Sequence, residues 1–83
     1  MNIVVLGATG GIGAKLSLNL SEDNNLFLGS RDQQKFLNLK DEIKYNQINS
    51  KKIGGSQVDV TDFDSIKNFI DESNNFLGSI DCI

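Results

Sequence analysis

A glycine-rich turn near the start of the chain is the feature that most constrains its fold. Residues 3–6 form a solid apolar run, which is typical of a strand buried on both faces. Glycines then interrupt the run and lead directly into an amphipathic helix from Gly11 to about Glu22. This arrangement leaves unpaired backbone N–H groups at a helix N-terminus, where a diphosphate can bind. The chain therefore begins as a nucleotide-binding domain begins.

Each residue type in the turn has a use in binding phosphate. Glycine adopts the positive φ of a tight turn and allows phosphate oxygens to approach the backbone. The N–H groups of the first helical turn are unpaired donors, and a threonine hydroxyl adds another polar group. A P-loop is excluded, because Lys15 lies between Ala14 and Leu16 and not in a Gly-Lys-Ser/Thr segment. The alternative is a turn that needs glycine only for packing. The predicted phosphate-binding residues are Gly7, Thr9, Gly10, Gly11, Ile12 and Gly13.

The rest of the chain alternates between short apolar runs and helical spacings. Connections of this length suit crossovers between parallel strands, and right-handed crossovers place the strands in the order 3-2-1-4. We therefore predict an α/β fold of the Rossmann type, a three-layer αβα arrangement with a parallel sheet and the order β-α-β-α-β-α-β, as a single domain over residues 1–83. The predicted strands lie at 3–6, 26–28, 57–60 and 80–83, the helices at 11–22, 32–45 and 61–77, and a polar loop at 46–56.

The helical spacings also predict apolar faces. The third helix is expected to begin at Thr61, whose hydroxyl can accept a hydrogen bond from the N–H of Asp64, and to end at Gly78. The predicted apolar faces consist of Ile12, Leu16 and Leu20 in the first helix and of Phe63, Ile66, Phe69 and Ile70 in the third.

Composition excludes several classes of function. Eight basic and eleven acidic residues give a net charge of −3 without a basic stripe, so neither nucleic acid nor an anionic membrane is an expected partner. The longest apolar run has four residues, too few to span a bilayer, and a secretory leader is not expected, because Met1 and Asn2 lead directly into the first apolar run. The single cysteine fits a reducing, cytoplasmic location. The absence of histidine excludes His-based triads and most zinc sites, and no metal site is predicted.

The turn at residues 7–13 resembles the Gly-x-x-x-Gly-x-Gly turn of the short-chain dehydrogenase/reductase family. Three later segments agree with this resemblance, which covers the whole chain in order. Residues 26–31 look like the family's second strand and ribose-side loop, Asp-Val-Thr-Asp at 59–62 matches a segment after the third strand, and residues 76–83 resemble the approach to the fourth strand. One departure is Leu6, where many members carry threonine.

The resemblance implies which nucleotide binds. Ser30 occupies the position of the acid that pairs with the ribose in NAD-using members, and Arg31 follows it, as in NADP-using members. An arginine there accepts the 2′-phosphate, so NADP(H) is expected in preference to NAD(H); the alternative is that Arg31 is a solvated loop residue. The resemblance also implies that Asp59 accepts a hydrogen bond from the adenine amino group, with the Val60 backbone alongside. The other role open to Asp59 is to accept from N–H groups of its own turn.

The family's catalytic residues are not found in this chain. They are a serine, a tyrosine and a lysine four residues after the tyrosine, whereas Tyr45 lies on a helix surface and is followed four positions on by Asn49. Cys82, in an apolar run, is expected to be a buried structural thiol. We expect the front part of a longer NADPH-dependent oxidoreductase that acts on a carbonyl or alcohol substrate, with oligomer contacts, if any, made by later helices. The alternatives are a complete, non-catalytic, sensor-like NADPH-binding protein and the front of an extended-type epimerase or dehydratase.

Overall fold

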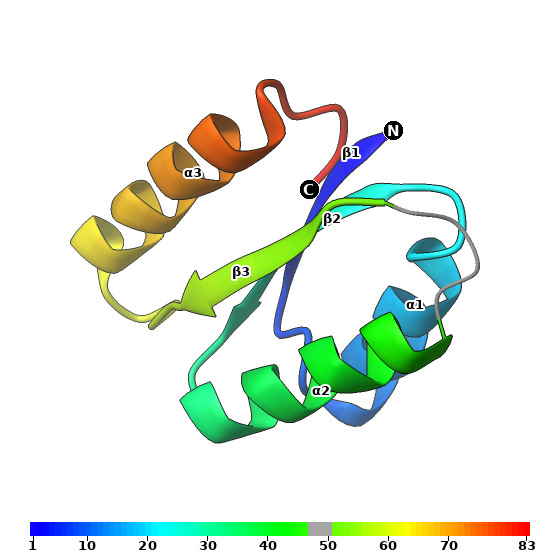
Figure 1. The fold of residues 1–83 in the computed structure, drawn as a ribbon. Coiled ribbons are helices and arrows are strands. Elements are labelled where there is room, and N and C mark those ends of the chain that lie inside the picture. The colour runs from blue at the N-terminus through cyan, green and yellow to red at the C-terminus, as the bar shows by residue number, and fades with distance from the viewer. Residues whose placement is uncertain (47–50) are drawn as a thin grey trace.

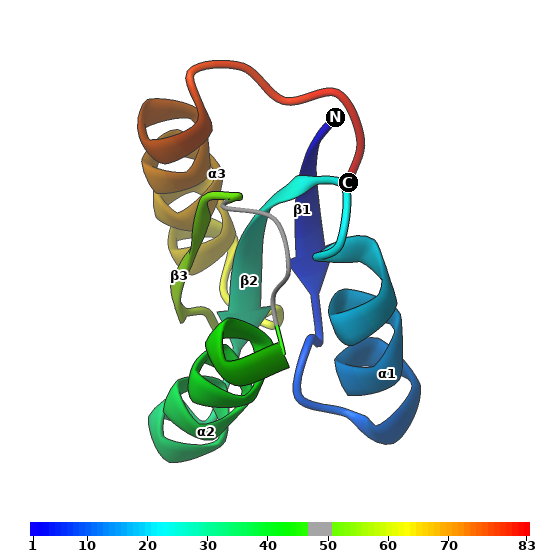
Figure 2. The same ribbon diagram turned by 45° about the vertical axis from the view of Figure 1, so that its right-hand side comes forward.

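The computed structural model describes residues 1–46 and 51–83, which form three layers (Figure 1). Helices α1 and α2 lie together on one side of a parallel sheet, and α3 lies on the other side (Figure 2). This arrangement confirms the predicted Rossmann-type α/β fold. The elements are β1 (Asn2–Leu6), α1 (Gly11–Leu20), β2 (Asn25–Ser30), α2 (Gln33–Asn46), β3 (Ile53–Gln57) and α3 (Phe63–Leu77).

The sheet has β2 at its centre. Its three strands are parallel in the order β1-β2-β3, with Val4 opposite Phe27 and Phe27 opposite Gly54. On the free side of β1, Cys82 forms an isolated parallel bridge with Ile3, and the Val4 N–H donates to the Cys82 carbonyl over 2.9 Å. The end of the chain thus occupies the fourth position of the predicted order 3-2-1-4, although in the described residues only this single bridge marks it.

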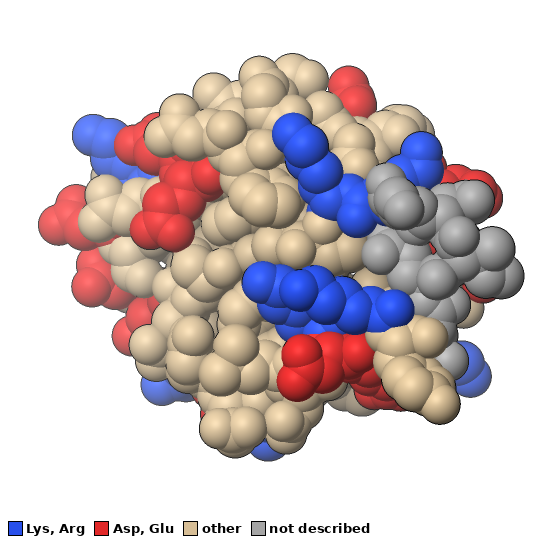
Figure 3. Space-filling model, in the orientation of Figure 1, with Lys and Arg blue, Asp and Glu red and all other residues tan. Residues whose placement is uncertain are grey.

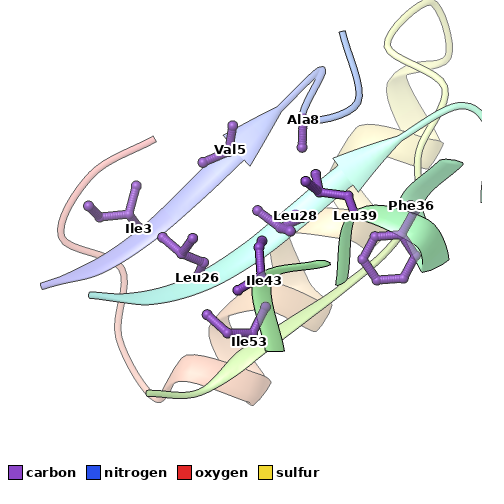
Figure 4. Packing of buried hydrophobic residues seen from close by; sticks show 9 residues of the cluster. All are labelled: Ile3, Val5, Ala8, Leu26, Leu28, Phe36, Leu39, Ile43 and Ile53. Atoms are coloured by element: carbon purple, nitrogen blue, oxygen red, sulfur yellow. The ribbon is translucent and has the colours of Figure 1, made fainter. Parts of the chain in front are cut away.

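Alternation along the strands produces a core on each side of the sheet. The cluster between the sheet and the α1–α2 layer is drawn in Figure 4. On the α3 side, the centroid of the Phe27 ring lies 5.2 Å from that of Phe69 and 5.5 Å from that of Phe76, within the range of aromatic contacts, at interplanar angles of 46° and 48°. The first cluster consists of Ile3, Val5, Ala8, Leu26, Leu28, Phe36, Leu39, Ile43 and Ile53, and the second of Val4, Phe27, Val58, Phe69 and Leu77.

The third strand lies earlier in the chain than predicted. It covers Ile53–Gln57, so Gly54 and Gly55 belong to the strand and not to a loop; residues 47–50 of the predicted loop lie outside the described residues. Both glycines are required by packing. A Cβ on Gly54 would lie 2.7 Å from the Phe76 ring, and one on Gly55 would collide with the Leu28 carbonyl oxygen. The two glycines therefore mark a close approach within the sheet.

The apolar face predicted for α1 is largely wrong. Ile12 is 87% exposed and Leu16 is 46% exposed, whereas Ser17 is completely buried. Leu16 is partly exposed because it lines an open groove beside β1. On the inner side, the helix approaches its own turn closely at Gly13, which favours small side chains. The Ser17 hydroxyl is satisfied there because it donates to the Gly13 carbonyl over 2.7 Å. The apolar residues of α1 that do pack against the core are Ala14, Leu18 and Leu20.

The start of α3 also differs from the prediction. Asp62, and not Thr61, is the N-cap, because its carboxylate accepts from the Asp64 N–H over 3.0 Å. Phe63 is 79% exposed, since helical side chains lean toward the N-terminus and the first residue therefore points past the packed segment. The predicted end is confirmed, with Gly78 as C-cap at φ 87°. The buried residues of α3 are Phe69, Ser73 and Leu77.

The surface shows mixed charge. In Figure 3, basic side chains gather between the centre and the right of the face, acidic groups lie directly below them, and further acidic groups lie at the left edge. Tyr45 is 91% exposed, as predicted for a helix-surface residue.

Cys82 is exposed and not buried, because it borders an open apolar groove together with Leu6, Leu16 and Ile83. Within residues 1–46 and 51–83, no helix is long and apolar enough to cross a membrane, and no group of side chains could hold a metal ion.

Candidate nucleotide-binding site

The turn between β1 and α1 leaves the start of the helix open to an anion. Gly7 has φ 69°, in the left-handed region that glycine adopts readily. The N-cap is Gly10, which has no side chain with which to cap the helix, and its carbonyl accepts the first helical bond from Ala14 over 2.8 Å. Among the described residues, no side chain therefore caps the N–H groups of the first turn, where the helix dipole favours negative charge. Gly11, Ile12 and Gly13 form this first turn.

The glycines of the turn fall into two groups according to their surroundings. A Cβ on Gly13 would lie within 3.0 Å of the Gly7 carbonyl oxygen, a separation that real Cβ atoms essentially never show. By contrast, a Cβ on Gly10 would make only an ordinary contact at 3.5 Å, and one on Gly11 would meet no described atom within 4 Å. Packing thus explains Gly13 but not Gly10 and Gly11. Bare backbone with open space beside it is what a closely approaching phosphate requires.

A cavity of about 250 Å³ lies at the carboxyl ends of the strands. The turn after β1, the end of β2 and the loop after β3 each contribute to it, because the carboxyl ends of parallel strands meet at one edge of the sheet. Six predicted site residues are brought together in its lining, which consists of Gly7, Thr9, Gly10, Ser30, Arg31 and Val60, together with Gly29 and Val58.

Two hydrogen bonds join the turn to the end of β2. The Ala8 N–H donates to the Gly29 carbonyl over 3.0 Å, and the Thr9 and Ser30 hydroxyl oxygens are 2.8 Å apart. Ser30 is only 2% exposed, and its hydroxyl oxygen also accepts from the Asp32 N–H over 3.1 Å. The turn and the ribose-side loop are therefore held as one unit.

Arg31 lies between this cavity and a second one of about 310 Å³. The second cavity is also lined by Gln57, Val58, Asp59 and Ser65. Because Arg31 is exposed, its positive charge can reach an anion in either cavity. The structure thus places Arg31 next to the phosphate-binding turn on one side and Asp59 on the other.

Asp59 is held by its own turn. One carboxylate oxygen accepts from the Thr61 hydroxyl over 2.6 Å and from the Thr61 N–H over 3.0 Å. These bonds, the hydroxyl first, lower the pKa of Asp59 from its usual range; partial burial opposes them, and the charge of Arg31 adds to them. Asp59 is therefore ionised at neutral pH, and it fills the turn role that the sequence left open.

Replacing Thr61 with valine should raise the pKa of Asp59 toward the ordinary aspartate value, because the variant loses the hydroxyl donor. The native pKa is below the unfolded one, so the stabilisation is complete above the unfolded pKa and is lost as the pH falls through the native pKa. A ¹³C NMR titration of the Asp59 carboxyl group measures the shift. Thr61→Ser keeps the hydroxyl and should keep the low pKa; an unchanged pKa in Thr61→Val would contradict this account.

Sequence reasoning missed two polar residues of the second cavity. Gln57 ends β3 opposite Ser30, and its side-chain amide donates to the Arg31 carbonyl over 2.9 Å. The Ser65 hydroxyl accepts from the Asp59 N–H over 2.9 Å. A correct placement of the third strand would have located Gln57, because parallel strands bring their last residues together. No local signal distinguishes Ser65.

The chain is similar to known oxidoreductases. A family model described as short chain dehydrogenase matches residues 1–83. A metagenomic short-chain oxidoreductase solved in complex with NADP superimposes with a TM-score of 0.86 at 25% identity, over 99% of this chain and 36% of that one. An alcohol dehydrogenase from the archaeon Thermococcus sibiricus, complexed with 5-hydroxy-NADP, gives a TM-score of 0.87 at 25% identity, over 96% and 34%.

A further similarity is to shikimate dehydrogenase (NADP(+)) from Methanococcus maripaludis, which is 36% identical over 69 residues, or 81% of this chain and 24% of that protein. The chain thus spans about a third or less of the length of these relatives. The family model, by contrast, matches every residue of the chain. The order of strands and the glycine turn agree with that match, and the chain belongs to the short-chain dehydrogenase/reductase family.

Proposed function

We propose that this chain is the NADP(H)-binding part of a short-chain dehydrogenase/reductase that transfers hydride between NADPH and a carbonyl or alcohol substrate. The observation that carries the proposal is the open backbone at Gly10 and Gly11, which lies next to a cavity that Arg31 borders. The relatives solved with NADP and with 5-hydroxy-NADP support the choice of nucleotide.

The diphosphate is assigned to the turn. The diphosphate oxygens would accept hydrogen bonds from the backbone N–H groups of Gly11, Ile12 and Gly13 and approach the bare backbone of Gly10. Gly7 shapes the turn. The Thr9 hydroxyl, which lines the same cavity, is a further polar contact. This donor set is neutral, so the helix dipole supplies the positive potential.

The adenosine half is assigned to the ends of β2 and β3. We assign Arg31 to the 2′-phosphate, and its exposed position at the border of both cavities supports this assignment. Asp59 is ionised and has one carboxylate oxygen engaged by Thr61, which leaves the other for the adenine amino group. Val60 is 52% exposed beside it and offers its backbone. Ser30 completes this side of the cavity.

The bound nucleotide would supply the hydride, and the residues of this chain would hold the nucleotide in place. We assign substrate recognition and proton transfer to the whole protein, because the only tyrosine in the sequence, Tyr45, is 91% exposed on α2 and lines neither cavity. A reducing, cytoplasmic location is part of the proposal, since the single cysteine has no partner for an intramolecular disulfide.

Calorimetric titration of the chain with NADPH, and separately with NADH, tests the proposal. We expect saturable binding of both, with NADPH bound more tightly because only NADPH carries the 2′-phosphate. Binding of neither nucleotide would contradict the proposed function. Equal affinities would retain nucleotide binding but contradict the assignment of Arg31 to the 2′-phosphate.

A further inference from the structure

The buried hydroxyl of Ser30 contacts another site residue. Ser30 ends β2, whereas Thr9 belongs to the turn after β1, yet their hydroxyl oxygens are 2.8 Å apart. Ser30 is 2% exposed and lies against Asp32 on its other side, with the Asp32 N–H and carbonyl oxygen both 3.1 Å from its hydroxyl oxygen. A buried hydroxyl in this position is better placed to orient Thr9 than to reach a ligand.

The surroundings of Ser30 favour one direction for its single proton. The Asp32 N–H donates to Ser30, so the Ser30 proton must go to Thr9 or to the Asp32 carbonyl. That carbonyl accepts the first helical bond of α2 from the Phe36 N–H over 3.0 Å and keeps a second lone pair, so distance decides between the two acceptors. The contact with Thr9 is the shorter, at 2.8 Å against 3.1 Å. The proton of Ser30 is therefore best placed on the side of Thr9.

This direction leaves the proton of Thr9 free to bind a ligand. Thr9 lines the 250 Å³ cavity beside Gly7 and Gly10. Among the described residues its hydroxyl makes no hydrogen bond other than the one with Ser30. An acceptor oxygen in the cavity would complete a chain of donors that runs from the Asp32 N–H through Ser30 and Thr9 to the ligand.

We infer that Ser30 is a positioning residue, which orients the Thr9 hydroxyl toward a phosphate oxygen of the nucleotide and does not itself bind the 2′-phosphate. The inference rests on the proposed function and deepens it. A backbone hydrogen bond from Ala8 to Gly29 joins the same two segments over 3.0 Å. Removing either hydroxyl should therefore leave the turn attached to β2.

A double-mutant cycle on the full chain tests this inference, with Ser30→Ala, Thr9→Val and the double variant titrated calorimetrically with NADPH and with NADH. Ser30→Ala should weaken the binding of NADPH and of NADH by the same factor, about two- to tenfold, which is the usual effect of losing one hydrogen bond. Thr9→Val should lose at least as much affinity for each nucleotide as Ser30→Ala does. In the Thr9→Val background, Ser30→Ala should cause no further loss, because Ser30 would act only through Thr9.

Three controls separate this role from a general structural one. Thr9→Ser keeps the hydroxyl and should bind as the wild type does. Ser73→Ala removes an equally buried hydroxyl, one that donates to the Ile70 carbonyl of α3, and should change neither affinity. If Ser30→Ala loses its cooperative unfolding transition, Ser30→Cys serves in its place, because the thiol fills the site and replaces the hydroxyl with a much weaker hydrogen-bond donor.

Each result has a definite meaning. A loss in Ser30→Ala confined to NADPH would overturn the inference, because it would show a direct contact with the 2′-phosphate. If Ser30→Ala reduced nucleotide affinity by the same factor in the wild-type and the Thr9→Val backgrounds, the inference would also be overturned, since the two residues would then act independently. A wild-type chain that binds neither nucleotide would overturn the proposed function as well.

Discussion

Gly13→Ala is expected to destabilise the native state by about 1–3 kcal/mol, the usual cost of forcing extra volume into a packed site. The new Cβ would lie within 3.0 Å of the Gly7 carbonyl oxygen and 3.2 Å from the Ala8 Cα. Both are backbone atoms of the turn, so neither can move away by a change of rotamer. The midpoint of a urea unfolding curve measures the loss.

Gly11→Ala is the matched control for that variant, because it adds the same methyl group two residues earlier in the same helix. Its Cβ meets no described atom within 4 Å, and alanine favours the helix, so stability should stay constant or rise by up to about 1 kcal/mol. NADPH affinity should nevertheless fall by about ten- to a hundredfold, since the methyl group occupies the space assigned to phosphate. Equal stability losses in the two variants would contradict the division of the glycines into two groups.

Arg31→Ala should weaken NADPH binding by about ten- to a hundredfold and leave NADH binding unchanged. The reason is the loss of a charge-assisted hydrogen bond to the 2′-phosphate, worth about 1.5–3 kcal/mol. Arg31 borders both cavities from an exposed position, so rising salt should reduce the wild-type preference for NADPH as well. Titration of wild type and variant with both nucleotides measures the effect.

Two further variants show whether the effect belongs to this side chain. Arg31→Lys keeps the charge but not the planar pair of donors, so its loss of NADPH affinity should be smaller than that of Arg31→Ala. Lys67→Ala removes a cation of the same sign from the exposed surface of α3 and should change neither affinity. If Arg31→Ala weakened NADPH and NADH by the same factor, the arginine would serve some part common to both nucleotides.

Features that depend on local chemistry could be predicted from the residues. The apolar run at 3–6, the glycines after it and the helical spacing that follows identify a strand, a turn and a helix without reference to other segments. The order of strands followed as well, since crossovers between parallel strands have a fixed hand. The resemblance to the family, and not local chemistry alone, implied roles for Ser30, Arg31 and Val60, and the fold brings them to the cavity beside the turn.

Features that depend on contacts between distant segments could not be predicted in this way. Gly54 and Gly55 indicate a loop when taken alone, yet they lie in β3, paired with β2. Glycine suits these strand positions because Phe76, Phe36 and Leu28 lie where a Cβ would be. The inward face of α1 likewise depends on how closely the helix approaches its own turn. Gln57 entered the site only when its strand was paired with β2.

Local patterning was thus sufficient to identify the nucleotide-binding turn and the parallel α/β architecture, because periodicity and turn chemistry are properties of neighbouring residues. The tertiary structure decided which glycines serve packing and which leave space for a ligand, and it decided that Ser30 is buried against Thr9. Those properties are distances between atoms of elements far apart in the sequence, and they are set by how the helices and strands pack together.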